Sequence, residues 1–190
     1  MRIVVGVVTA LALAACHARY RASSTAAPVI HLADCRGRAR SLPDSLARRL
    51  PPRTGRMQPD DQWADLALTT PGGFAGVFYD SAHTPILQLA RPELADTAKA
   101  VLAEKLAFPV RRAVVRPARW DFAQLVDWFN YLYPRLSPGP SLADKDEALN
   151  RIRLAASSPA ARDHLIQTLK AMDLPCDLVI VDPRDFTVSY

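Results

Sequence analysis

Residues 74–80, Phe74-Ala75-Gly76-Val77-Phe78-Tyr79-Asp80, are the stretch that decides the fold class. Aromatic and β-branched side chains dominate this run, which predicts a strand, and Pro85 to Ala90 follows across a short turn as its hairpin partner. Pro92 fits the first position of a helix whose apolar face continues to Leu106. The central block is therefore predicted as a strand pair followed by a helix.

The residues after this block predict further alternation of strands and helices. A Pro/Gly/Ser loop at 134–141 separates two halves, and the charged run 144–147 is interpreted as a solvated loop or the start of a helix. Further strands are predicted at 113–115, 151–154, 177–181 and 186–190, and further helices at 42–50, 60–68, 121–133 and after Ser158. This order predicts an α+β fold, in which helices pack on one face of a mainly antiparallel sheet.

The N-terminus has the three parts of a secretory signal peptide. Arg2 supplies the positive charge, Ile3 to Leu13 is an uncharged and mostly apolar stretch, and two small residues follow. A membrane span needs about 20 apolar residues, so this stretch is too short to be one. The four residues Leu13-Ala14-Ala15-Cys16 resemble the lipobox of bacterial lipoproteins.

This resemblance implies a lipid anchor on Cys16. In that family the cysteine thiol is joined to a diacylglyceryl group, the chain is cut before the cysteine, and the new amine usually receives a fatty acid such as palmitate. An ordinary signal peptide with a chance cysteine is the alternative. Residue 17 is His and not Asp, which under the sorting rule of enteric lipoproteins favours the periplasmic side of the outer membrane over the inner membrane.

The predicted domains differ in charge. We expect residues 1–15 to be the signal peptide, 16–59 a lipid-anchored basic tether with a short helix, and 60–190 a single α+β domain. The segment 16–59 carries a net charge of +7 and the segment 60–190 a net charge of −3. The acidic body argues against nucleic-acid binding. The tether arginines could contact anionic lipid headgroups, or they could be solvated residues without a role.

Two cysteines remain once Cys16 is assigned to lipidation. Cys35 and Cys176 form an even pair in an oxidising compartment, which predicts a disulfide between them. The alternative is a reactive thiol, but neither cysteine belongs to a CxxC motif or adjoins a histidine.

Residues that could carry chemistry are scattered. His17, His31, His83 and His164 lack the spacing of metal ligands, and Asp163-His164 has no serine in a nucleophile elbow. We therefore expect no catalytic residues, no metal and no cofactor. Trp128 and Tyr131 lie off the apolar stripe of their helix, so they form either an exposed contact patch or part of the core.

A weaker resemblance covers residues 74–133. Residues 74–80, the alanine-rich helix, the next strand and Phe122-Ala123-Gln124-Leu125 are similar to the pro-regions of alpha-lytic-type secreted serine proteases, which act as foldases and inhibitors. No protease domain follows Tyr190 in this sequence, so such a role would operate in trans.

These observations lead to one expected function and two alternatives. The expected function is a lipid-anchored cell-envelope protein that binds or assembles with an envelope partner and is not an enzyme. The alternatives are an envelope hydrolase with dispersed site residues and a protease-inhibitor or chaperone-like module acting in trans.

Overall fold

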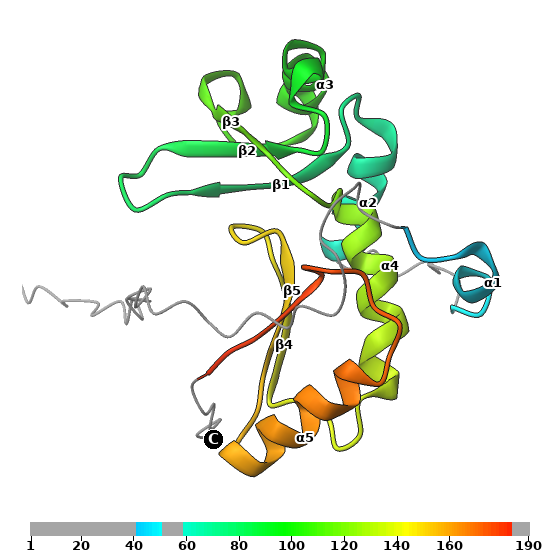
Figure 1. Cartoon of the computed structure of the whole chain (residues 1–190). Coiled ribbons are helices and arrows are strands. Elements are labelled where there is room, and N and C mark those ends of the chain that lie inside the picture. Colours follow the sequence, from blue (N-terminus) through cyan, green and yellow to red (C-terminus); the bar gives the residue numbers. More distant parts are fainter. Residues whose placement is uncertain (1–40, 51–58, 184–190) are drawn as a thin grey trace, which may run out of the picture.

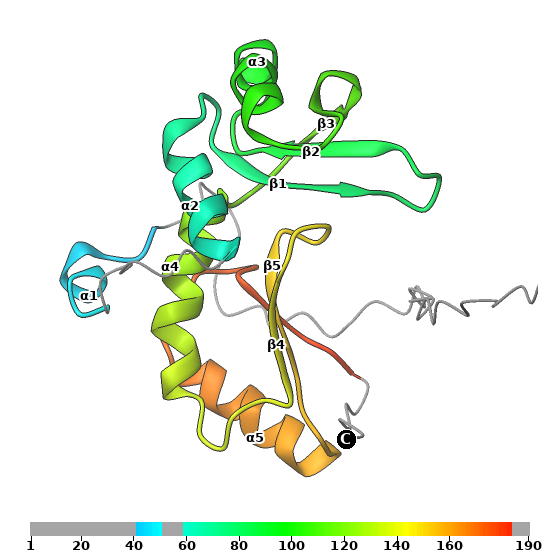
Figure 2. The ribbon, with the colours of Figure 1, turned by 180° about the vertical axis from the view of Figure 1, so that it is seen from behind.

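The computed structural model describes residues 41–50 and 59–183 (Figure 1). The predicted signal peptide, Cys16, Cys35 and the predicted strand 186–190 lie outside these residues. Figures 1 and 2 show two small sheets, one above the other, with helix α4 (Phe122–Leu132) running along one side from the level of β1 (Phe74–Tyr79) to α5 (Pro159–Lys170). Helix α4 is an element that the two units built on these sheets share.

The two units repeat one order of elements. In the first, β1 (Phe74–Tyr79) and β2 (Pro85–Leu89) form an antiparallel hairpin, and β3 (Val114–Pro117) then pairs parallel to β2. In the second, β4 (Leu142–Asp146) and β5 (Arg151–Ala155) form the hairpin, and β6 (Val179–Val181) pairs parallel to β5. The predicted α+β class is confirmed, but the strands form two mixed sheets and not one mainly antiparallel sheet.

Helical segments make the parallel crossovers. Between β2 and β3 the chain forms η1 (Pro92–Leu94), α3 (Ala95–Lys105) and η2 (Val110–Arg112), and between β5 and β6 it forms α5 (Pro159–Lys170). A parallel neighbour requires such a crossover because the chain must return to the same end of the sheet. Each crossover helix also buries its apolar residues on its own sheet, so each unit has a core.

Helix α4 contributes to both cores. Phe122, Ala123 and Val126 pack in the first core with Phe74 of β1, whereas other α4 side chains pack in the second core. The α4 residues of the second core are Leu125, Trp128 and Leu132. Helix α2 (Pro59–Thr69) lies on the first core through Ala64 and Ala67, and Leu42, just before α1 (Asp44–Ala47), is buried in the second. The packed body thus includes residues that the sequence analysis assigned to the tether.

Strand β4 corrects the interpretation of the charged run. Asp144-Lys145-Asp146 is paired with β5 and is neither a solvated loop nor a helix start. The Lys145 side chain is only 8% exposed; its Nζ lies 2.9 Å from Asp60 Oδ2 and 3.7 Å from the centre of the Phe129 ring. An ion pair and a cation–π contact therefore accommodate a charge that the sequence pattern placed in solvent.

Trp128 does not belong to an exposed contact patch. Its side chain is 1% exposed and packs in the second core, whereas Tyr131 is half-buried and meets Trp128 edge to face at 5.8 Å between ring centroids. The patch prediction is wrong for Trp128 because helix α4 has core on two sides, so residues off one apolar stripe are also buried.

Asn150 joins the two units at the end of the β4–β5 turn. It is 4% exposed and has a φ of +55°. Its Oδ1 accepts hydrogen bonds of 2.8 Å from the backbone N–H groups of Arg119 and Trp120, and its Nδ2 donates one of 2.9 Å to the Trp120 carbonyl. One side chain thus satisfies three backbone groups of the β3–α4 connection.

We expect Asn150→Gly to lower the free energy of unfolding by about 2–3 kcal/mol, because it leaves three backbone groups without their partner. Glycine keeps the left-handed backbone accessible, so Asn150→Ala should cost about 1 kcal/mol more. Urea unfolding of both variants measures the two effects. Equal stability of Asn150→Gly and the parent chain would contradict the bridging role.

Candidate functional site

An open pocket of about 920 Å³ lies where β2 and β3 end. Ala90 and Arg91 follow β2, and Ala118 and Arg119 follow β3, so all four come from the carboxyl ends of neighbouring parallel strands. In open sheets with parallel strands, ligands bind in the crevice outside these ends. The end of α2 and the start of α4 complete the walls.

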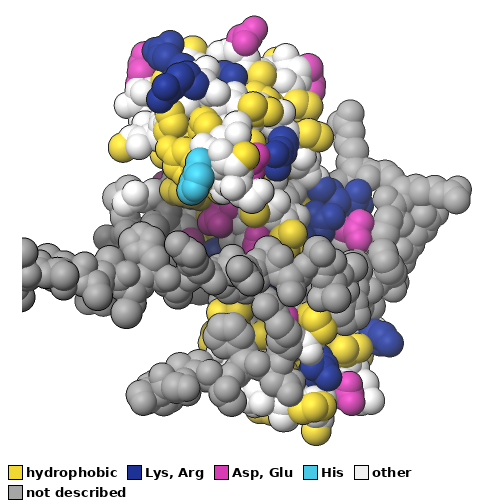
Figure 3. Space-filling model, turned by 90° about the vertical axis from the view of Figure 1, so that its left-hand side faces the viewer, with side chains coloured by type: hydrophobic (Ala, Val, Ile, Leu, Met, Phe, Trp, Pro, Cys, Tyr) yellow, Lys and Arg dark blue, Asp and Glu magenta, His cyan; other side chains and the backbone are white. Residues whose placement is uncertain are grey.

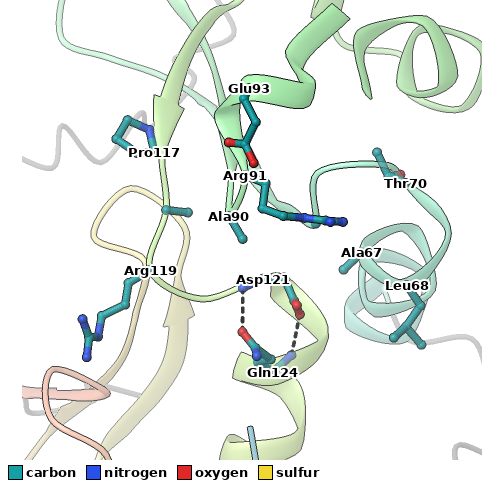
Figure 4. A pocket seen from close by; sticks show the side chains of 12 residues that line it. Ala67, Leu68, Thr70, Ala90, Arg91, Glu93, Pro117, Arg119, Asp121 and Gln124 are labelled. Atoms are coloured by element: carbon teal, nitrogen blue, oxygen red, sulfur yellow. Dashed lines mark hydrogen bonds between the residues drawn. The ribbon is translucent and has the colours of Figure 1, made fainter. Parts of the chain in front are cut away.

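The pocket is lined by small apolar side chains together with polar and charged ones. Figure 4 shows the methyl groups of Ala67 and Ala90 facing the space from opposite sides. Arg91 extends across the upper side and Asp121 lies below, while the side chain of Arg119 points away from the pocket. One guanidinium therefore faces the space together with the carboxylates of Glu93 and Asp121.

A capping box holds Asp121 in place at the start of α4. Its Oδ1 accepts a hydrogen bond of 2.8 Å from Gln124 N, and Gln124 Oε1 accepts one of 3.1 Å from Asp121 N. Gln124 Nε2 also donates to Ser41 Oγ at 2.8 Å. These bonds fix the carboxylate at the pocket wall, because moving it would break the cap of the helix.

Other polar groups of the pocket have unused hydrogen-bonding capacity. The side chains of Arg91 and Glu93 are exposed and form no hydrogen bond or ion pair with any described residue. Thr70 is 4% exposed, and its Oγ1 has no hydrogen-bond partner among residues 41–50 and 59–183. A buried hydroxyl without a partner carries a desolvation cost.

A polar cluster outside the pocket lies where the β4–β5 turn meets the first sheet. Gln88 is buried; its Nε2 donates to the Ala148 carbonyl at 3.3 Å, and its Oε1 has no partner within the described part of the chain. Gly76 has a φ of +138°, and a Cβ there would lie 3.0 Å from Cβ and Cγ of Glu147. The strand thus has a glycine where the Glu147 side chain packs.

Glu147 is a half-buried carboxyl group in this cluster. Desolvation by burial raises its pKa above the ordinary value of 4.5, and the charges of Asp144 and Asp146 raise it further. Its ionised form is therefore less favourable in the folded chain than in the unfolded chain.

The raised pKa of Glu147 predicts a pH-dependent effect on stability. Below the unfolded pKa of about 4.5 the group is protonated in both states, whereas the folded state is penalised as the pH rises through the folded pKa. We expect Glu147→Gln to be more stable than the parent chain at pH 7 and equally stable near pH 3. Urea unfolding at both pH values measures this, with the exposed Glu104→Gln as matched control. A pH-independent difference would contradict the prediction.

The structure places the sequence-derived candidates apart from one another. His83 lies in the β1–β2 turn and His164 on the exposed side of α5, where its Nε2 lies 3.2 Å from the Ser137 carbonyl. Cys176 is buried and disulfide-bonded. Cys35 lies outside the described residues, so the Cys35–Cys176 pairing stays a prediction.

Metal sites and membrane-spanning helices are both absent from the part of the chain that the structure describes. There, no three His, Cys, Asp or Glu side chains gather so that they could hold a metal ion. No described helix has both the length and the apolar content required to cross a bilayer. Exposed apolar side chains such as Tyr79 and Val114 lie in the first unit, where Figure 3 shows hydrophobic atoms scattered among polar ones.

No protein-family model, curated protein or solved structure matches this chain. The resemblances to the lipobox and to protease pro-regions therefore rest on the residues alone.

The pocket residues were missed because the sequence analysis did not assign parallel pairing. The signal was available in the order strand, helix, strand over residues 85–117, since a helical crossover favours a parallel neighbour. That pairing would have placed residues 90–91 and 118–119 at one edge of the sheet.

Proposed function

We propose that this chain is a lipid-anchored protein of the bacterial cell envelope that acts by binding another molecule. The observation that carries the proposal is Leu13-Ala14-Ala15-Cys16 at the end of an eleven-residue uncharged stretch. A thiol is needed at the last position because the thioether linkage requires a good nucleophile. Two or three acyl chains are enough for durable anchoring, whereas one chain is marginal.

The length of chain between Cys16 and the packed body supports this arrangement. Leu42 is buried in the second core, and 25 residues separate it from Cys16. A chain of this length spans at most about 90 Å when fully extended. The body could therefore stand clear of the headgroups, while the arginines nearest the anchor stay within reach of anionic lipids.

The pocket supports the binding role. It combines an apolar surface with fixed charges, and its volume of about 920 Å³ falls within the range of small-molecule sites. Asp121 is held in place by the capping box of α4, and the backbone of Arg91 lies two residues beyond the end of β2. A wall that is held in place before the ligand arrives lowers the entropy cost of binding.

The anchor is tested on the protein isolated from membranes. We expect the N-terminal peptide to begin at Cys16 and to carry the mass of a diacylglyceryl group with or without an additional acyl chain. A mature chain that begins elsewhere, or an unmodified Cys16, would contradict the lipoprotein proposal.

A further inference from the structure

We infer that the pocket at the ends of β2 and β3 binds a small ligand carrying one cationic and one anionic group, as a short peptide with free termini does. This inference rests on the proposed binding role and names its ligand class. Its basis is the charge of the walls, where the Arg91 guanidinium faces the same space as the carboxylates of Glu93 and Asp121 (Figure 4).

A ligand with a single charge fits these walls poorly. An anion alone would meet Arg91 but also two carboxylates, since Arg119 is directed away from the space. A cation alone would meet the carboxylates but also Arg91. Like charges at short range repel, so a ligand with both charges is favoured when each end meets its opposite.

The hydrogen-bonding groups at the walls suit the two ends of such a ligand. Arg91 can bind a carboxylate in a bidentate manner, and its side chain has no partner among the described residues. The side chain of Glu93 is likewise without a described partner and can accept from an ammonium group. The Asp121 carboxylate, held by the bond from Gln124 N, adds a second negative charge to this side of the pocket.

The middle of the pocket suits a backbone with small side chains. Ala67 and Ala90 present methyl groups between the charged walls (Figure 4), and Ala118 also lines the pocket. The volume of about 920 Å³ leaves room for several residues, so a single amino acid would fill only part of it.

The test uses the mature lipidated chain in detergent micelles and trialanine as the probe, with binding measured by calorimetry. N-acetyl-trialanine lacks the cation and trialanine amide lacks the anion. We expect trialanine to bind, and each modified peptide to bind at least about 10-fold more weakly, since a charge-assisted hydrogen bond supplies about that ratio.

Variants assign each charge to its wall. We expect Arg91→Gln to bind trialanine about 10-fold more weakly and to respond little to amidation of its carboxyl end, since the partner of that end is gone. For Glu93→Gln, acetylation of the amino end of trialanine should weaken binding less than it does for the parent chain. Arg112→Gln and Glu104→Gln, which are exposed outside the pocket, are the matched controls and should bind like the parent chain.

Several results would overturn the inference. These are the absence of trialanine binding into the millimolar range, equal binding of the three peptides, and equal losses in the pocket and control variants. Thermal unfolding of each variant shows whether it is folded. Lipidation of Cys16 is measured separately by mass, so failure of peptide binding is distinguishable from failure of the anchor.

Discussion

Loss of the predicted Cys35–Cys176 disulfide is expected to lower the free energy of unfolding by about 4–5 kcal/mol, the loop-closure entropy of a crosslink over about 140 residues. Cys176 is buried and disulfide-bonded, and it stands immediately before Asp177, whose carbonyl accepts a hydrogen bond of 3.3 Å from Trp120 Nε1. The crosslink would therefore tie the segment after the lipid anchor to the connection between α5 and β6.

Single and double variants separate the crosslink from local packing. If the two cysteines pair, Cys35→Ser, Cys176→Ser and the double variant should lose similar stability, because the second substitution has no crosslink left to remove. Cys176→Ser should cost somewhat more than Cys35→Ser, since it also places a hydroxyl at a position that is 4% exposed. Urea unfolding measures all three. Additive losses, or alkylation of both thiols without reductant, would contradict the pairing.

The sequence was most informative where one residue period dominates a segment. Strand β1 (Phe74–Tyr79) and helices α3 and α5 lie close to their predicted positions, because aromatic and β-branched runs favour strands and a proline at the first turn favours a helix. The capping box at Asp121 and Gln124 likewise begins α4 close to where the apolar periodicity indicated. Local patterns of this kind indicate a helix or strand without any information on its tertiary contacts.

Strand β4 was missed because its stability comes from distant residues. Its sequence Leu142-Ala143-Asp144-Lys145-Asp146 has three charges and no β-branched residue, so propensity argues against a strand. Pairing with β5 and the contacts of Lys145 with Asp60 and Phe129 outweigh that propensity. These partners lie far apart in sequence, and no local pattern indicates them.

The candidate pocket depended on topology more than on motifs. Arg91 and Asp121 are 30 positions apart and belong to no recognised motif; they meet because β2 and β3 run parallel and α4 starts close to their ends. In a mainly antiparallel sheet the carboxyl ends of neighbouring strands lie at opposite edges, so that prediction does not bring Arg91 and Asp121 to one site. A motif can indicate a site from sequence only when one short segment carries the chemistry, and the lipobox-like residues 13–16 are a prediction of that kind.

Replacement of Cys16 by serine is expected to abolish lipid anchoring completely. A serine hydroxyl is not ionised at neutral pH and cannot form the thioether, so neither the diacylglyceryl group nor the cleavage that follows it should occur. The chain should then keep residues 1–15 and have the mass of the unprocessed precursor. Cys35→Ser is the matched control, since it removes a thiol but should leave cleavage before Cys16 and the mass of the lipidated N-terminal peptide at Cys16 unchanged.

Mass and salt extraction together decide the role of Cys16. An uncleaved signal peptide could itself hold the Cys16→Ser chain at a membrane, so location alone is insufficient and the mass of the N-terminal peptide is the primary readout. A chain without lipid that is held only by its tether arginines on anionic headgroups should leave the membrane in high salt, because salt screens exposed charges. Acyl chains contribute about 0.8 kcal/mol per buried methylene and are not screened, so the parent chain should resist the same wash. Recovery of Cys16→Ser in salt-washed membranes with the normal mature mass would contradict the lipobox assignment.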